Sequence, residues 1–245
     1  MTFSTGFQSN LGIISALVGR NDYVILDKED HASIYDACRL SYGKLLRYEH
    51  NDMEALERCL QRVPESAGAL IVTDGLFSMS GDIANLPEIV RLAKTYGARI
   101  MVDDAHGLGT LGKGGRGTPS HFGLEQEVDV YMGTFSKSLA SLGGYMAGKS
   151  RIVDYVRHNS RPFIFSASVP PASCAAALAA LNVLEEEPEL PERLLRLSDF
   201  FREALKQRGM SIRESRTPIV PIFTYTADRT LRIAMELYKQ GLFVN

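Results

Sequence analysis

Lys137 is the first residue of this sequence that suggests covalent chemistry. It ends the segment GTFSK at residues 133–137, between an apolar run at 128–135 and a turn rich in serine and glycine. Most lysines in such turns are simply solvated. A lysine that the protein desolvates has a lowered pKa, and its neutral amine can add to a carbonyl group. The residues that share its site decide between these two interpretations.

Polar residues follow four of the apolar runs that are predicted as strands. In an open parallel sheet, ligands bind beyond the carboxyl ends of the strands, so these residues are expected to share one cleft. The segment DKEDHAS contributes His31, and TDGLFS contributes Asp74 and Ser78. The segments VDDAHG and GTFSK contribute the others: Asp103, Asp104, His106, Thr134, Ser136 and Lys137.

The residue types in this cleft favour one chemistry over two others. Asp103 with His106 is a thin ligand set for a metal. The nucleophile elbow GxSxG of a serine hydrolase is absent from the sequence. A lysine beside an acid and a histidine suits a Schiff base to an aldehyde cofactor, and pyridoxal phosphate needs an acid that keeps its ring nitrogen protonated. The sequence therefore predicts a pyridoxal phosphate site around Lys137 and no metal site.

The glycine turn STGFQSNLG at residues 4–12 is the candidate for binding the phosphate. Backbone N–H groups at the start of a helix bind anions, and the hydroxyls of Ser78 and Thr134 are expected to add hydrogen bonds. By itself the turn is equally compatible with an ordinary capped helix. It supports the cofactor hypothesis only together with the other residues.

Short apolar runs rich in β-branched residues alternate with segments of helical periodicity. This alternation is typical of βα units around a mostly parallel sheet that is buried on both faces. Six strands are predicted, at residues 23–27, 44–49, 69–75, 99–105, 128–135 and 143–148. A further strand-like run, PIVPIFTYT, occupies residues 218–226.

The segments between these runs carry helix signals. Asn51 or Asp52 is expected to cap one helix, and a second is expected to begin at Asn85 and to stop at Gly97. Beyond residue 148 the pattern is mostly helical, with helices predicted at 151–157, 171–186 and 191–208 and a last one that ends at Gly241.

Composition excludes several classes of protein. With 245 residues, 45% of them hydrophobic, the chain can bury a full core. A net charge of -2 without a basic, aromatic-rich stripe disfavours a nucleic-acid partner. The three cysteines lack CxxC spacing, no apolar run has the length of a membrane span, and MTFSTGFQSN lacks the features of a signal peptide. We therefore expect a cytoplasmic protein without a transmembrane segment.

Six segments together resemble the motifs of the α-oxoamine synthases, a family of pyridoxal-phosphate enzymes. They span almost the whole chain: TGFQSNLG, DHASIYDAC, TDGLFSMSGDIANL, VDDAHGLGTLGKGGRG, GTFSKSLASLGGY and RPFIFSASVPPA. The resemblance implies fold type I of the pyridoxal-phosphate-dependent transferases. This is the aspartate-aminotransferase-like α/β fold, with a mostly parallel central sheet flanked by helices.

The resemblance also implies a role for each catalytic residue. Lys137 is expected to bind the cofactor through a Schiff base and, once released, to remove the Cα proton of the substrate. Asp103 is expected to pair with the pyridine nitrogen and His106 to hydrogen-bond the phenolic oxygen. His31 is expected to stack on the cofactor ring. Asp74 stands where other members often carry glutamate.

The phosphate contacts follow from the resemblance in the same way. Gly6 and Phe7 are expected to offer backbone N–H groups, and Ser166 or Ser168 of FSAS to reach the phosphate of a neighbouring subunit. We therefore expect a homodimer with shared sites. The full cofactor-binding set is Lys137, Asp103, His106, His31, Ser78, Thr134, Gly6, Phe7 and Ser166.

The implied reaction condenses an amino acid with an acyl-CoA and releases CoA and CO2. The segments TFSKSLASLGGY and RPFIFSAS most resemble those of the members that use L-serine. Members that use L-alanine with a pimeloyl thioester, or glycine with acetyl-CoA, are the alternatives. An aminotransferase that needs no acyl-CoA and a non-catalytic or truncated remnant are alternatives of other kinds, although Lys137 with Asp103 and His106 argues against a dead site.

Members of the family are longer than this chain, so we expect a fragment or a truncated protein. The resemblance predicts a cofactor-binding large domain at residues 1–165 and its helical continuation at 166–215. The start of an incomplete C-terminal small domain is predicted at 216–245. The family's arginine for the substrate carboxylate has no candidate in the sequence.

Overall fold

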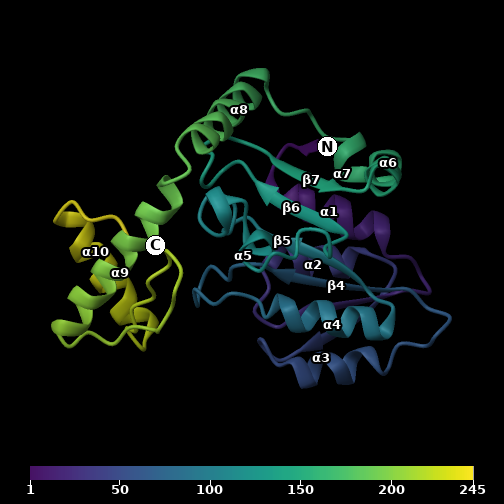
Figure 1. Ribbon diagram of the computed structural model, residues 1–245, viewed down its shortest axis with the longest axis horizontal. Helices are drawn as coiled ribbons and strands as arrows, with labels where there is room; N and C mark the ends of the chain where they lie inside the picture. Colours follow the sequence, from purple (N-terminus) through teal and green to yellow (C-terminus); the bar gives the residue numbers. More distant parts are fainter. Residues whose placement is uncertain (245) are drawn as a thin grey trace.

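The computed structural model describes residues 1–244, which are built around one seven-stranded sheet in the order β1-β7-β6-β5-β4-β2-β3 (Figure 1). The five strands from β3 to β6 are parallel, whereas β7 is antiparallel to both β6 and β1. The strands are β1 Thr2–Phe3, β2 Tyr23–Asp27, β3 Lys44–Tyr48, β4 Ala69–Asp74, β5 Arg99–Asp103, β6 Val130–Thr134 and β7 Gly144–Gly148. The mostly parallel α/β sheet is confirmed, and only the two-residue β1 was not predicted.

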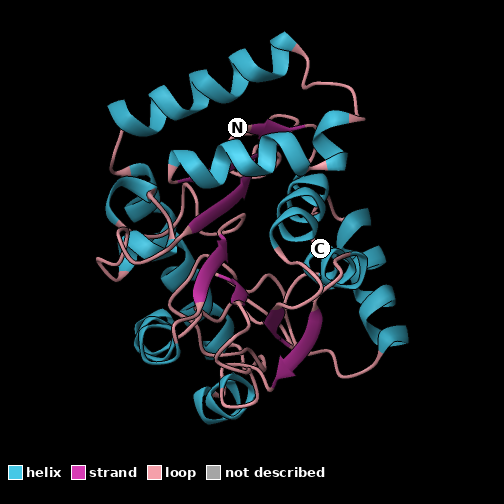
Figure 2. Ribbon diagram, turned by 90° about the vertical axis from the view of Figure 1, so that its right-hand side faces the viewer, coloured by secondary structure: helices cyan, strands magenta, loops and turns pink. Residues whose placement is uncertain are grey.

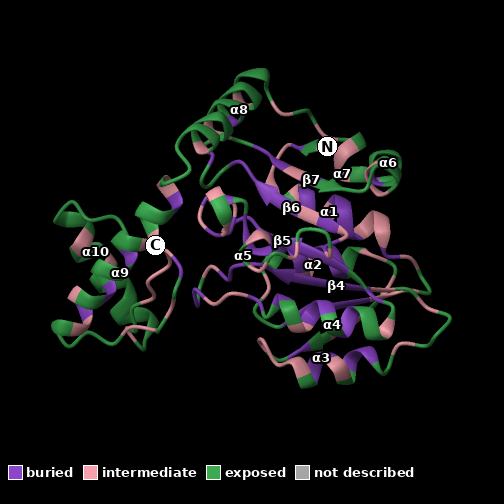
Figure 3. Ribbon diagram, in the orientation of Figure 1, coloured by how far each residue is buried: buried purple, intermediate pink, exposed green. Residues whose placement is uncertain are grey.

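Alternate residues of the central strands enter different cores. Ile25 and Ile71 pack on one face of the sheet with α3 and α4, whereas Val24 and Val72 pack on the other face with α1, α2 and α6. Side chains of a strand point to opposite faces in turn, so apolar residues at every position require cover on both sides. Helices therefore lie on both sides of the strands, and the strands are the buried part of the molecule (Figures 2 and 3).

The helices of the sheet region follow the predicted pattern. They are α1 Gly6–Leu17, α2 Ala32–Leu40, α3 Met53–Leu60, α4 Leu86–Tyr96, α5 Thr118–His121, α6 Ser150–Asn159 and α7 Arg161–Ile164, with a 3-10 turn at Lys113–Gly115. Asp52 caps α3, and Gly97 ends α4 with a φ of 69°, a conformation that glycine adopts without strain. Asn85 is the N-cap residue of α4, as predicted, although its side chain makes no capping hydrogen bond.

The C-terminal part consists of α8 Pro171–Glu186, α9 Leu190–Gln207 and α10 Ala227–Lys239. The helices α9 and α10 form a lobe beside the sheet, and α8 leads to it (Figure 1). The predicted strand at 218–226 was wrong, because only an isolated bridge between Ile212 and Ile222 forms there. Pro218 and Pro221 lack the N–H groups that a strand ladder requires.

No helix within residues 1–244 is both long and apolar enough to cross a membrane.

Candidate active site

The carboxyl ends of the parallel strands meet at one edge of the sheet. Asp74 at the end of β4 pairs in register with Asp103 at the end of β5, and Thr134 ends the neighbouring β6. The start of α1 and the residue before α2 reach the same edge, and together these elements enclose a cavity of about 260 Å³. Its walls include Gly6, Phe7, Asn10, His31, Ser33, Asp74, Asp103, His106, Thr134, Ser136 and Lys137. The structure thus brings most of the predicted site residues together.

The start of α1 lines one side of this cavity. Thr5 caps the helix by accepting a hydrogen bond from the N–H of Gln8 at 3.1 Å, so the first N–H groups of α1 lack partners inside the helix. A Cβ atom at Gly6 would lie only 3.0 Å from Thr134 Oγ1. Glycine therefore keeps space open between the helix start and the hydroxyls of Thr134 and Ser136, which are 2.9 Å apart. This is a cradle for an anion.

Asp103 is held with one carboxylate edge toward the cavity. Its Oδ1 accepts a hydrogen bond from the N–H of Ala105 at 3.0 Å, and its Oδ2 accepts one from Asn10 Nδ2 at 2.7 Å. Asn10 also donates to Ser33 Oγ at 2.9 Å, so it connects α1, β5 and α2. Asp103 and Asn10 are 5% and 1% exposed, and a buried carboxylate held by such bonds is a rigid partner for a cation.

Lys137 and His106 face each other in the cavity. Lys137 Nζ lies 2.7 Å from His106 Nε2. Burial, followed by the charges of Lys137 and His31, lowers the pKa of His106 to about 4, so the ring is neutral at pH 7 and accepts a proton of the ammonium. Burial also lowers the pKa of Lys137, against the opposing effects of Asp103 and Asp74. The lysine is therefore closer to the neutral, nucleophilic form than a solvated lysine is.

Two hydrogen bonds, one of its side chain and one of its backbone, hold His31 at the cavity. Its Nδ1 accepts a hydrogen bond from the N–H of Ser33 at 3.2 Å, and its own N–H donates to Asp74 Oδ2 at 3.1 Å. His31 as a whole is exposed, and it lines the cavity. Burial, followed by the charges of Asp103 and Asp30, raises the pKa of Asp74 well above its usual value.

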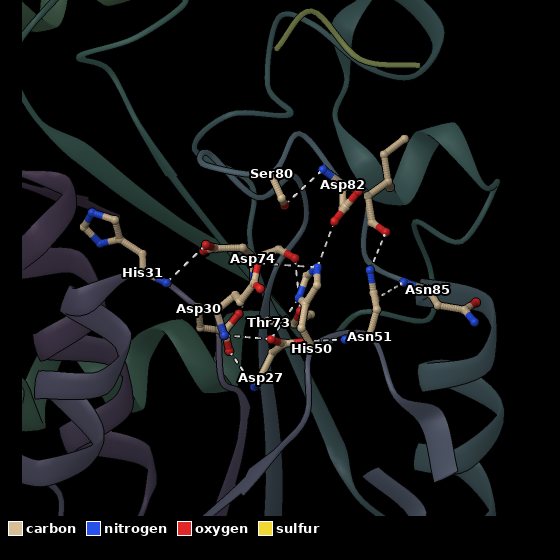
Figure 4. A network of polar contacts seen from close by, with 12 residues as sticks. Asp27, Asp30, His31, His50, Asn51, Thr73, Asp74, Ser80, Asp82 and Asn85 are labelled. Carbon is tan, nitrogen blue, oxygen red and sulfur yellow. Dashed lines mark hydrogen bonds and ion pairs between the residues drawn. The ribbon is translucent and has the colours of Figure 1, made fainter. Parts of the chain in front are cut away.

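A buried polar network lies behind Asp74 (Figure 4). Asp30 accepts hydrogen bonds from the N–H groups of Asp74 at 2.7 Å and of Asp27 at 2.9 Å, which joins the ends of β4 and β2. His50 bridges Asp27 and Asp82, at 3.0 Å from each carboxylate. These carboxylates raise its pKa to about 9, with Asp27 the larger cause.

The same network holds the C-terminal segment. Arg213 Nη2 contacts Asp82 Oδ2 at 2.5 Å, and Thr217 Oγ1 donates to the carbonyl of Gly81 at 3.0 Å. Hydrogen bonds and ion pairs therefore connect the segment after α9 to the backbone of His31.

Asp104 has a different role from its neighbour Asp103. Its carboxylate accepts hydrogen bonds from both the N–H and the hydroxyl of Thr118, each at 2.7 Å. A Cβ atom at Gly117 would lie 1.8 Å from its Oδ2, so only glycine fits there. Asp104 therefore holds the loop between β5 and α5 and does not line the cavity.

Two of the predicted phosphate contacts also lie outside the cavity. Ser78 is not among its walls, and Ser166 instead accepts a hydrogen bond from Gln8 Nε2 at 3.2 Å. The sequence interpretation missed Asn10 and Ser33. Asn10 is a buried amide on an otherwise apolar helix face, and this polarity is the only signal that marks it in the sequence.

Within residues 1–244, no group of three or more His, Cys, Asp or Glu side chains is placed to hold a metal ion. The site therefore offers a lysine, an acid and an anion cradle.

Comparison with known proteins first identifies the protein family to which the chain belongs. The chain matches the family Aminotransferase class I and II over residues 1–245, and it belongs to that family.

Similarity to individual proteins is more specific than the match to the family. The chain is 52% identical over 243 residues to a serine palmitoyltransferase of Sphingobacterium spiritivorum, covering 99% of this chain and 61% of the relative. It is 44% identical over 244 residues to an 8-amino-7-oxononanoate synthase of Thermoanaerobacter pseudethanolicus, covering 99% of this chain and 62% of the relative. These names confirm the resemblance to the α-oxoamine synthases. The chain spans about three fifths of the length of these relatives.

Solved structures confirm the fold-type I architecture. A serine palmitoyltransferase variant from S. paucimobilis with a bound PLP-myriocin aldimine has a TM-score of 0.96 at 39% identity, covering 100% of this chain and 64% of that chain. An 8-amino-7-oxononanoate synthase from Francisella tularensis has a TM-score of 0.84 at 29% identity, covering 100% and 71%.

Proposed function

We propose that this chain carries the cofactor site of a pyridoxal-phosphate-dependent acyltransferase that condenses L-serine with an acyl-CoA. The observation that carries the proposal is the meeting of Lys137, His106 and Asp103 with the start of α1 in one cavity of about 260 Å³. The 52% identity to a serine palmitoyltransferase supports serine as the amino acid.

The residues present fit pyridoxal phosphate. The group carries a phosphate, an aldehyde, a phenolic oxygen and a ring nitrogen. Gly6 and Phe7 offer unpaired N–H groups with the hydroxyls of Thr134 and Ser136 beside them, and Lys137 offers an amine. His106 offers a ring nitrogen next to Lys137, and Asp103 offers a fixed carboxylate.

Each of these residues then has a task that follows from its contacts. When bound, pyridoxal phosphate supplies an aldehyde that condenses with amines and a ring that withdraws electrons from the substrate Cα. Lys137 would hold the aldehyde, and its Nζ, once released, would be the base for the Cα proton. Asn10 and the N–H of Ala105 fix the carboxylate of Asp103, whose negative charge would favour a proton on the ring nitrogen. His106 would hydrogen-bond the phenolic oxygen, and His31 would cover the ring.

The test is a spectroscopic titration followed by turnover. Protein loaded with pyridoxal phosphate is mixed with L-serine, L-alanine or glycine, and CoA release from an acyl-CoA is then measured. We expect the absorbance of the bound cofactor to respond to serine at the lowest concentration, with CoA released from a long-chain thioester. A response to alanine with CoA release from pimeloyl-CoA would instead make this an 8-amino-7-oxononanoate synthase, and glycine with acetyl-CoA a glycine C-acetyltransferase. Amino-group transfer without CoA release would contradict the proposal.

We also infer a homodimer with shared sites in the cytoplasm. Ser166 contacts Gln8 of its own chain beside the start of α1, so the dimer is inferred from the resemblance to the α-oxoamine synthases. Cys38, Cys59 and Cys174 are free thiols, as in a reducing compartment. The domain division at residues 165 and 215 stays a prediction.

A further inference from the structure

Ser33 contacts the ring of His31 through both its hydroxyl and its backbone. Ser33 Oγ lies 2.7 Å from His31 Nδ1, and the N–H of Ser33 donates to the same nitrogen at 3.2 Å. His31 is the N-cap residue of α2, so the bond from this N–H is the capping bond of the helix. Ser33 is only 1% exposed, and its hydroxyl must therefore find its partners within the protein.

The tautomer of His31 follows from these two donors. A neutral imidazole ring has one N–H group and one nitrogen with a lone pair, and only the second nitrogen accepts hydrogen bonds. The N–H of Ser33 can therefore donate to Nδ1 only when Nδ1 carries no proton. Among residues 1–244, Nδ1 is also the one acceptor within hydrogen-bond distance of the Ser33 hydroxyl. A proton on Nδ1 would thus break the capping bond and leave a buried hydroxyl without an acceptor.

Asn10 fixes the hydroxyl of Ser33 from a second side. Asn10 Nδ2 donates to Ser33 Oγ at 2.9 Å and to Asp103 Oδ2 at 2.7 Å. The opposite orientation of this amide would place its oxygen against the carboxylate of Asp103, and an ionised carboxylate only accepts hydrogen bonds. Ser33 Oγ therefore accepts from Asn10 and donates to His31, and the two bonds hold the hydroxyl in one orientation.

We propose that Ser33 is a positioning residue that keeps His31 in the tautomer with its ring proton on Nε2. The inference rests on the proposed function, in which His31 covers the ring of the cofactor. Because Nδ1 is occupied, Nε2 is the ring nitrogen of His31 without a hydrogen-bond partner in the described part of the chain. His31 lines the cavity, so a ligand that reaches Nε2 meets a hydrogen-bond donor.

A donor on His31 suits the amino-acid substrate. Serine, alanine and glycine all carry a carboxylate, whose oxygens accept hydrogen bonds and, when ionised, donate none. In the other tautomer, the lone pair of Nε2 would face these oxygens, and no hydrogen bond would form. Ser33 therefore acts on the amino acid through the ring of His31.

The backbone of His31 is held independently of its tautomer. Its N–H donates to Asp74 Oδ2 at 3.1 Å (Figure 4), and its carbonyl accepts a hydrogen bond from the N–H of Ile34 at 2.9 Å. Neither bond involves the hydroxyl of Ser33. Removal of this hydroxyl therefore leaves His31 in place and changes only the constraint on its ring.

The first test measures the tautomer by NMR and needs no turnover. The holoenzyme is prepared with 15N-labelled histidine as wild type, Ser33→Ala and Ser33→Thr, and the signal of His31 is identified by its absence from His31→Gln. Spectra are recorded at about pH 8.5, two units above the ordinary histidine pKa of about 6.5. We expect wild type and Ser33→Thr, which keeps a hydroxyl, to carry the ring proton on Nε2. Ser33→Ala should contain about fivefold more of the tautomer with its proton on Nδ1.

The second test measures binding of the amino acid. The L-serine concentration that half-saturates the absorbance response of the bound cofactor should rise about two- to fivefold in Ser33→Ala, with kcat for CoA release nearly unchanged. Ser41→Ala is the matched control. Ser41 lies at the C-terminal end of the same helix, and its hydroxyl donates to the carbonyl of Cys38 at 2.7 Å. This control should keep both the wild-type spectrum and the wild-type response to serine.

The spectrum of wild type can overturn the proposal by itself, because a proton on Nδ1 of His31 would contradict it without any variant. An unchanged tautomer in Ser33→Ala, or a Ser33→Thr variant that behaves as Ser33→Ala does, would also contradict the role of the hydroxyl. Failure of the proposed function gives a different result. Wild-type protein would then show no response to serine and release no CoA, while the spectra would still decide the tautomer of His31.

Discussion

His50 is expected to make the stability of this protein decrease as the pH rises above neutrality. Its ring lies 3.0 Å from both Asp27 and Asp82, and these carboxylates raise its pKa from 6.5 to about 9. A group whose pKa is raised on folding stabilises the folded state fully below its unfolded pKa and loses that contribution as the pH passes its folded pKa. The window for His50 therefore runs from pH 6.5 to about 9.

The size of the effect follows from the same pKa. At 1.36 kcal/mol for each pKa unit, the raised pKa of His50 stabilises the folded state by at most about 3.4 kcal/mol. Solvent reaches part of the ring, whose side chain is 16% exposed, and screening lowers the expected value to about 1–2 kcal/mol. Below pH 6.5, His50→Gln should reduce the free energy of unfolding by this amount, and above pH 9 by only about 0.5–1 kcal/mol, the value of neutral hydrogen bonds.

Urea unfolding of wild type and His50→Gln across this pH range is the assay. Asp30 and Asp74, whose pKa values burial raises, also favour the folded state at lower pH, but they are present in both proteins and largely cancel in the difference. His121→Gln is the control, since His121 has no carboxylate partner among the ion pairs of residues 1–244. A difference between wild type and His50→Gln that is independent of pH would refute the reasoning.

Three substitutions at the active site complete the predictions. Lys137→Ala should abolish both the visible absorbance of the cofactor and turnover but leave the thermal unfolding transition in place. Lys113 is an exposed lysine, and Lys113→Ala should change neither the absorbance nor turnover. Borohydride trapping of the cofactor on another lysine would contradict the role of Lys137. Asp103→Asn should slow Cα-proton exchange of the bound amino acid in D2O by orders of magnitude, several kcal/mol on the barrier, and near-normal exchange by NMR would exclude the assigned role. Asn10→Ala removes a 2.7 Å bond to that carboxylate, so we expect cofactor affinity in an equilibrium titration to fall about tenfold, and unchanged affinity would show that Asp103 needs no support from α1.

The sequence by itself determined the sheet and the edge at which the site lies. Residues 24–26 and 69–72 are apolar at every position, as in strands that are buried on both faces, and the structure has β2 and β4 there. Parallel strands end at one edge of a sheet, so the polar residues that follow them had to meet there. This rule predicts the positions of four site residues: Asp103, His106, Thr134 and Lys137.

Only the tertiary structure shows which segments that are distant in sequence contact one another. Asn10 reaches Asp103 across 93 positions of sequence, and Arg213 reaches Asp82 across 131, which no local pattern encodes. The strand predicted at 218–226 did not form, because prolines removed its ladder bonds while Thr217 fixed the segment to Gly81 instead. Periodicity reports which residues are buried, whereas the partner of a buried polar group depends on how the elements pack. The edge of the sheet could therefore be predicted from the sequence, whereas the contacts that support the site could not.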